Sequence, residues 1–76
     1  MNKANYDIRL IFSKRLKYLM EEKNLNIKEF SQKIGIPDST ISDWLLKKRT
    51  PKIENIPKIA TFFNVSTDFL FGLVEF

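Results

Sequence analysis

The sequence predicts an all-α fold, a compact domain of five short helices, and three observations support it. Apolar residues recur at helical spacing in successive segments of the chain. Capping residues and glycines stand where those segments begin and end. Only residues 69–74 are apolar and partly β-branched in the manner of a strand, and no second strand is available to pair with them. We therefore expect residues 1–76 to form a single domain without a sheet.

The first two helices are predicted from residues 7–35. Apolar side chains recur through residues 8–20 with charged ones on the opposite face, which predicts an amphipathic helix over about Asp7 to Lys23. Asn26 is a suitable N-cap, and Glu29 stands three residues further on, as in a capping box. Gly35 is expected to end this second helix in the left-handed conformation.

The third helix follows Pro37, which suits the first turn of a helix because it has no N–H to donate. Its buried face is expected at Ile41, Trp44 and Leu45. Residues 47–52 then form a basic loop that holds four of the 13 lysine and arginine residues.

The last two helices lie between residues 53 and 72. The fourth helix is expected to bury five apolar side chains, those of Ile53, Ile56, Ile59, Ala60 and Phe63. Ser66 caps a short fifth helix, and Gly72 closes it.

Composition limits the kinds of protein that the chain can be. It has no cysteine and no histidine, which excludes disulfides, the usual zinc sites and catalysis that depends on these side chains. We therefore expect no enzyme, no metal and no cofactor. The net charge of +4 favours an anionic partner such as nucleic acid. Because neither a signal peptide nor a membrane-spanning run is recognisable, we expect a cytoplasmic protein without a membrane partner.

Residues 27–46 have the layout of a helix-turn-helix motif. Two helices of two to three turns are joined by a tight turn at Gly35, and Ser31 is small where two steeply crossing helices must approach closely. In this layout the outward face of the second helix enters the major groove of double-stranded DNA.

Six fragments point to a family when they are taken in their order and spacing: RLK at 15–17, LN at 25–26, GI at 35–36, STISDW at 39–44, KRTP at 48–51 and NVSTDFL at 64–70. With them the chain resembles the lambda-repressor-like (XRE) helix-turn-helix family of phage repressors and bacterial transcription regulators. The resemblance covers residues 15–72 and implies sequence-specific DNA binding by a transcriptional regulator, with a repressor as the expected kind.

The resemblance also implies which residues contact DNA. The positions that read base edges in the family match Asp38, Ser39, Ser42 and Asp43. The positions that contact the phosphate backbone match Asn26, Lys47, Lys48, Arg49 and Lys52. The concentration of cations in the loop agrees with this role, since phosphate contacts dominate the affinity of such proteins.

Three departures from the family pattern are visible. Ile27 stands where many members have a glutamine that contacts phosphate, and a backbone N–H at this helix end is a possible substitute. Leu46 and Lys47 replace a frequent Asn-Gly, so a non-glycine residue is expected in the left-handed conformation. Met20 and Leu45 replace a buried arginine–glutamate pair, an exchange that is often neutral or stabilising.

The acidic character of the reading face leaves alternatives open. Asp38 either complements the positive end of its helix or reads a base, for which cytosine N4 is a suitable donor. Asp43 either contacts a base or forms a salt bridge with Lys47 four residues on. The alternative to DNA binding is a helix-turn-helix scaffold that serves as a protein–protein interaction module.

Residues 73–76 form an apolar C-terminal tail. This tail either folds back over the first helix or joins a two-fold contact, as the same region often does in the resembled family. We expect a homodimer, and its contact residues are Phe71, Leu73, Val74 and Phe76.

Overall fold

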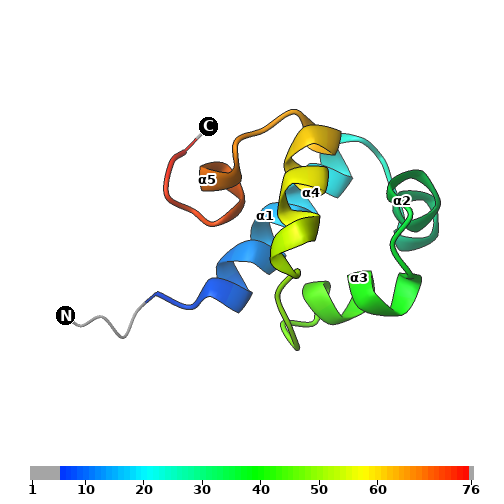
Figure 1. Ribbon diagram of the computed structural model, residues 1–76, viewed down its shortest axis with the longest axis horizontal. Coiled ribbons are helices and arrows are strands. Elements are labelled where there is room, and N and C mark those ends of the chain that lie inside the picture. Colours follow the sequence, from blue (N-terminus) through cyan, green and yellow to red (C-terminus); the bar gives the residue numbers. More distant parts are fainter. Residues whose placement is uncertain (1–5, 76) are drawn as a thin grey trace.

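The computed structural model describes residues 6–75, and the part of the chain that it describes is all-helical (Figure 1). Five α-helices follow in chain order: α1 (Ile8–Glu22), α2 (Ile27–Ile34), α3 (Asp38–Leu45), α4 (Ile56–Phe63) and α5 (Thr67–Leu70). A 3-10 helix, η2 (Ile53–Asn55), leads directly into α4. The predicted fold class is therefore confirmed, and none of the described helices is long and apolar enough to cross a membrane.

Short-range hydrogen bonds set most helix ends where the sequence predicts them. The side-chain oxygen of Asn26 accepts from the N–H of Glu29 at 2.8 Å, and the Glu29 carboxylate accepts from the N–H of Asn26 at 2.9 Å, which completes the capping box of α2. Gly35 ends that helix with a φ of 77°. Ser66 caps α5 by accepting from the N–H of Phe69 at 3.0 Å.

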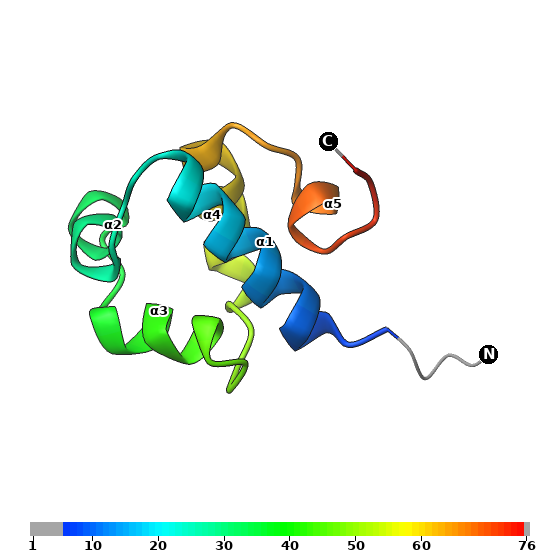
Figure 2. The ribbon, with the colours of Figure 1, turned by 180° about the vertical axis from the view of Figure 1, so that it is seen from behind.

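The hydrophobic core forms around α1, which crosses α4 and lies against α3 and α5 (Figures 1 and 2). Phe12 is fully buried between an aromatic ring of α3 and one that follows α5. Its ring meets Trp44 edge-on at 5.9 Å and stacks against Phe71 at 5.8 Å. A second aromatic group joins Phe30 of α2 to Phe62 and Phe63 of α4, so the two helices that flank α3 in sequence are packed on each other.

Two local predictions differ from the structure. Ile53 lies in η2 rather than on the buried face of α4, and it is 80% exposed because the chain enters α4 only at Ile56. Pro37 is the N-cap of α3 rather than a first-turn residue, with an extended ψ of 146°. Its carbonyl nevertheless starts the helix by accepting from the N–H groups of Thr40 and Ile41 at 3.1 and 3.2 Å.

A buried hydroxyl fixes α3 against α1. Ser13 of α1 is buried and donates a hydrogen bond of 3.1 Å to the carbonyl of Leu45, the last residue of α3. Met20 is buried, Leu45 packs against the core, and both line the same depression, so apolar side chains stand where a charged pair is frequent. The carbonyl of Leu45, which has no acceptor role within the helix, thereby accepts a hydrogen bond from a core side chain.

Candidate nucleic-acid interface

The turn between α2 and α3 is fixed by one side chain. The Ser31 hydroxyl donates to the carbonyl of Ile36 at 2.6 Å, and the Ile36 side chain is buried. α3 then runs along an edge of the molecule, packed on α1 and α2 with its opposite side turned outward (Figures 1 and 2). The structure thus has the arrangement that a helix-turn-helix motif requires.

The four predicted base-reading residues do not share one environment on α3. Asp38 and Ser39 are exposed in the first turn, whereas Ser42 and Asp43 are half-buried one turn later. No side chain caps the N-terminus of α3, because its N-cap residue is a proline, so the Asp38 carboxylate lies beside unpaired N–H groups.

Asp43 is paired with the basic loop, although not with the residue considered from the sequence. Its Oδ2 atom lies 3.2 Å from Nε of Arg49, and this pair takes the place of the Lys47 salt bridge. The reason is that α3 ends at Leu45 and Lys47 adopts a φ of 65°, which confirms the expected left-handed residue. The chain reverses there, with the N–H of Lys48 bonded to the carbonyl of Asp43 at 2.8 Å, and Arg49 returns alongside α3.

A basic cleft of about 280 Å³ lies between the start of α3 and the start of α4. Three cationic side chains line it, those of Arg49, Lys52 and Lys58. Trp44 also lines this cleft, and its indole N–H is buried without a hydrogen-bond partner. Lys58 was not among the predicted phosphate contacts, because it lies on α4 and only the fold brings it to the loop.

Two further cations lie near Asn26, at the start of α2. The side chains of Lys17 and Lys28 line a shallow depression together with Asn26, and the carboxylates of Glu21 and Asp38 line it as well. Since the capping box occupies the side-chain oxygen of Asn26, only its NH₂ group remains to bind a phosphate. Lys17 and Lys28 were not predicted as phosphate contacts, because no motif marks them and only the fold brings Lys17 next to Asn26.

The basic loop is exposed as predicted for a backbone-contacting segment. Lys47, Lys48, Arg49 and Lys52 all have exposed side chains. Together with Lys17 and Lys28, they place cations on two sides of α3, since one depression is lined by Thr40 and Trp44 of this helix and the other by Asp38 and Leu45.

The predicted dimer residues are divided between the core and the surface. Phe71 turns inward onto Phe12, while Leu73 and Val74 are 64% and 43% exposed; Phe76 lies outside the described residues. Arg15 holds this segment in place, because its guanidinium lies 4.4 Å from the ring centre of Phe69 and donates to the carbonyl of Val74 at 3.1 Å.

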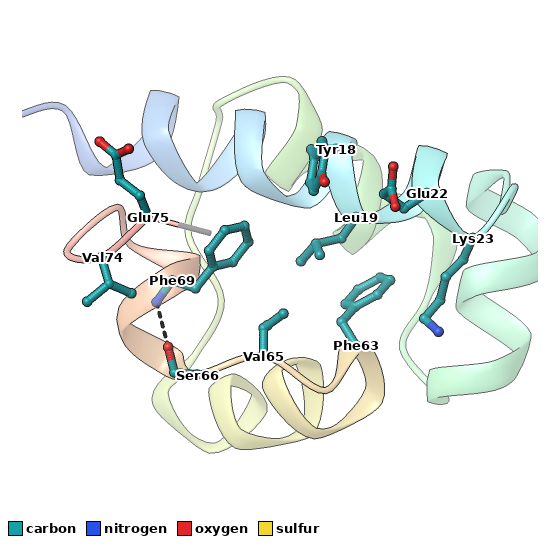
Figure 3. Close-up of a pocket in the computed structure, with 10 residues that line it drawn as sticks. All are labelled: Tyr18, Leu19, Glu22, Lys23, Phe63, Val65, Ser66, Phe69, Val74 and Glu75. Atoms are coloured by element: carbon teal, nitrogen blue, oxygen red, sulfur yellow. Dashed lines mark hydrogen bonds between the residues drawn. The ribbon is translucent and has the colours of Figure 1, made fainter.

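A groove of about 500 Å³ runs between α1 and this C-terminal segment (Figure 3). The side chains of Leu19, Phe63, Val65 and Phe69 are gathered along it, with Tyr18 and Val74 also among its lining residues. Val74 of the tail therefore belongs to this groove, which Glu22, Lys23, Ser66 and Glu75 also line, whereas Leu73 is not among its lining residues.

These features define a class: a small all-α helix-turn-helix domain whose second motif helix is exposed between two basic regions. Comparison with known proteins agrees, since the helix-turn-helix family model matches residues 16–70. The chain belongs to this helix-turn-helix family, of the XRE type.

Two relatives have regulatory names. The chain is 32% identical over 62 residues to the HTH-type transcriptional regulator ImmR of Bacillus subtilis (strain 168), a match that covers 82% of the chain and 49% of that protein. It is 25% identical over 65 residues to the uncharacterized HTH-type transcriptional regulator YobD of the same strain, which covers 86% of the chain and 58% of that protein. The chain thus spans about half the length of these relatives. No solved structure matches it significantly.

Proposed function

We propose that this domain binds double-stranded DNA in a sequence-dependent manner as part of a transcriptional regulator, of the repressor kind. The observation that carries the proposal is the exposed face of α3 between two groups of cations. A helix of this size fits the major groove, and cations on two sides of it are placed to meet the phosphates that border the groove. The regulatory names of the two relatives support the same function.

The roles of the side chains follow from this placement. Asp38, Ser39, Ser42 and Asp43 form the surface that faces the bases. The phosphate contacts are Asn26, Lys47, Lys48, Arg49 and Lys52, with Lys17, Lys28 and Lys58 added by the fold. The domain needs no catalysis or cofactor for this work, and it acts in the cytoplasm.

Binding to a random DNA duplex across a salt series tests the proposal. Each phosphate that is neutralised contributes about −0.9 to the slope of log K against log salt, so the four loop cations account for a slope of up to about −4. Replacing Lys48 and Lys52 by glutamine should make the slope shallower by about 2. The matched control replaces Lys14 and Lys33, two exposed lysines that line neither basic region, and should change the slope little.

A second function, a protein-interaction module, is favoured by one observation, the groove that Val74 lines together with the side chains of Leu19, Phe63 and Phe69, next in sequence to the exposed Leu73. Absence of binding to random duplex even at low salt would refute DNA binding and leave this function in its place.

We also propose that the same apolar surface joins two copies into a dimer, with Leu73 and Val74 as its exposed contacts and Phe71 supporting them from below. Such symmetry suits palindromic DNA sites. Equilibrium sedimentation of the protein should show a dimer that the double replacement Leu73→Ser, Val74→Ser weakens. The control Ile53→Ser removes a still more exposed apolar side chain from η2 and should leave the dimer unchanged. A monomer at high micromolar concentration, with and without DNA, would contradict this assignment.

A further inference from the structure

The pairing of Asp43 with Arg49 changes what these two residues can do at DNA. A carboxylate on the reading face would lie beside phosphates of the same charge, which disfavours its approach. In this structure the guanidinium of Arg49 lies against the Asp43 carboxylate, with Nε 3.2 Å from Oδ2. The two side chains therefore reach the reading face as a neutral pair rather than as separate charges.

The order of exposure shows which group meets a partner first. The Arg49 side chain is 57% exposed and that of Asp43 is 28% exposed. The donor of the pair, the guanidinium, is thus more accessible to a partner than the carboxylate. No arginine, asparagine or glutamine occupies the other reading positions, where Asp38, Ser39 and Ser42 stand.

We propose that Arg49 is the base-reading residue of this domain, that it selects guanine in the major groove, and that Asp43 is its positioning residue. The proposal rests on the DNA-binding function proposed above and names the base that the site reads. It moves Arg49 from the phosphate contacts to the reading of a base, and Asp43 from direct contact with a base to a role that acts through Arg49.

The geometry of the pair fits this chemistry. The guanidinium uses its Nε edge toward Asp43, which leaves the two terminal nitrogens as a pair of parallel donors. Guanine presents two acceptors, O6 and N7, at the spacing that such a fork binds, and this is the commonest specific contact of arginine with DNA. The ion pair also holds the long side chain in one arrangement before binding, so less conformational freedom is lost when the base is contacted.

The decisive variant is Arg49→Lys, because lysine keeps the positive charge but lacks the planar fork. A selection of bound sequences from random DNA should show one guanine preference in the wild-type protein. In Arg49→Lys this preference should fall about 5- to 150-fold, the range of one bidentate contact, while the affinity for random duplex and its salt slope stay close to wild type.

Asp43→Asn tests the positioning role. It should lower the guanine preference about 1.5- to 5-fold, the range of an exposed ion pair, and should have no further effect on that preference when Arg49 is already lysine. Glu54→Gln is the matched control, because it removes one negative charge from an exposed carboxylate in η2, outside the reading face, and should leave the preference at that base pair unchanged. Each variant should unfold at a temperature close to that of the wild-type protein, which shows that its fold is intact.

Two results would overturn the inference while DNA binding itself stands. An unchanged base preference in Arg49→Lys would make Arg49 a phosphate contact only. If Asp43→Asn changes the base preference equally in the wild-type protein and in the Arg49→Lys variant, Asp43 contacts a base directly, for example cytosine N4. Failure of the wild-type protein to bind any duplex is a different result, seen before a variant is made, and it would overturn the proposed function together with the inference.

Discussion

The substitution Lys47→Gly is expected to raise the stability of the domain and to lower its affinity for DNA. Lys47 adopts a φ of 65° directly after α3, and its side chain is exposed in the basic loop. Glycine accepts this backbone conformation without steric cost. The N–H of residue 47 can still donate to the carbonyl of Trp44, a bond of 3.2 Å that does not depend on the side chain.

The size of the stability gain follows from two opposing terms. A left-handed conformation costs a residue with a Cβ roughly 1–2 kcal/mol. Glycine gives back about 0.4–1 kcal/mol because it makes the unfolded chain more flexible. A net gain of about 0.5–1 kcal/mol remains, which corresponds to a rise in melting temperature of about 2–8 °C for a domain of this size.

Thermal unfolding followed by circular dichroism measures this gain, and the salt series measures the loss of a phosphate contact. The slope of log K against log salt should become shallower by about 1. Lys48→Gly is the control: it removes the same charge one residue later, at a position without positive φ, and should not raise the melting temperature. A lower melting temperature for Lys47→Gly would refute the reasoning, and an unchanged salt slope would remove Lys47 from the phosphate contacts.

Three further outcomes are expected. Asn26→Ala removes the cap of α2 and should lower the free energy of unfolding by about 0.5–2 kcal/mol, as measured by denaturant titration. Asn26→Asp keeps the cap and should leave the free energy of unfolding unchanged, while gel-shift titration should show a weaker affinity for DNA. Gly72→Ala places a Cβ 2.7 Å from Cγ2 of Ile11 and should destabilise the domain by about 1–3 kcal/mol more than Gly35→Ala, which meets no atom within 4 Å; equal melting temperatures would contradict this. Arg15→Gln loses the contact with the Phe69 ring and should cost about 0.5–1 kcal/mol, with faster proteolysis after residue 72 as a second measure.

The helix ends could be predicted because their signals are local. The capping box at Asn26 and the left-handed glycine at position 35 involve residues only a few positions apart, so spacing in the sequence is spacing in space. Ile53 shows the limit of this reasoning. Its apolar character fitted the pattern of α4, but the pattern carries no information on where the first turn of that helix begins.

The site was harder to predict because it depends on a chain reversal. An Asp43–Lys47 salt bridge assumes that the helix continues for four residues, and α3 stops after two. The partner six residues away, Arg49, is selected by the left-handed turn at Lys47 rather than by helical periodicity. Lys58 was missed for a similar reason, since the packing of distant segments places it in the basic cleft, and the same kind of packing stacks Phe71 on Phe12.

The bond between Ser13 and the last carbonyl of α3 has a consequence for the spacing of DNA sites. It fixes the orientation of α3 relative to α1, and Tyr18 and Leu19 of α1 also line the groove. In a dimer joined through that groove, the two α3 helices would be held in one relative orientation with little freedom to rotate. Each added base pair between half-sites rotates one of them by about 35° around the duplex. Such a dimer would discriminate operators by the length of their central spacer as strictly as by their bases.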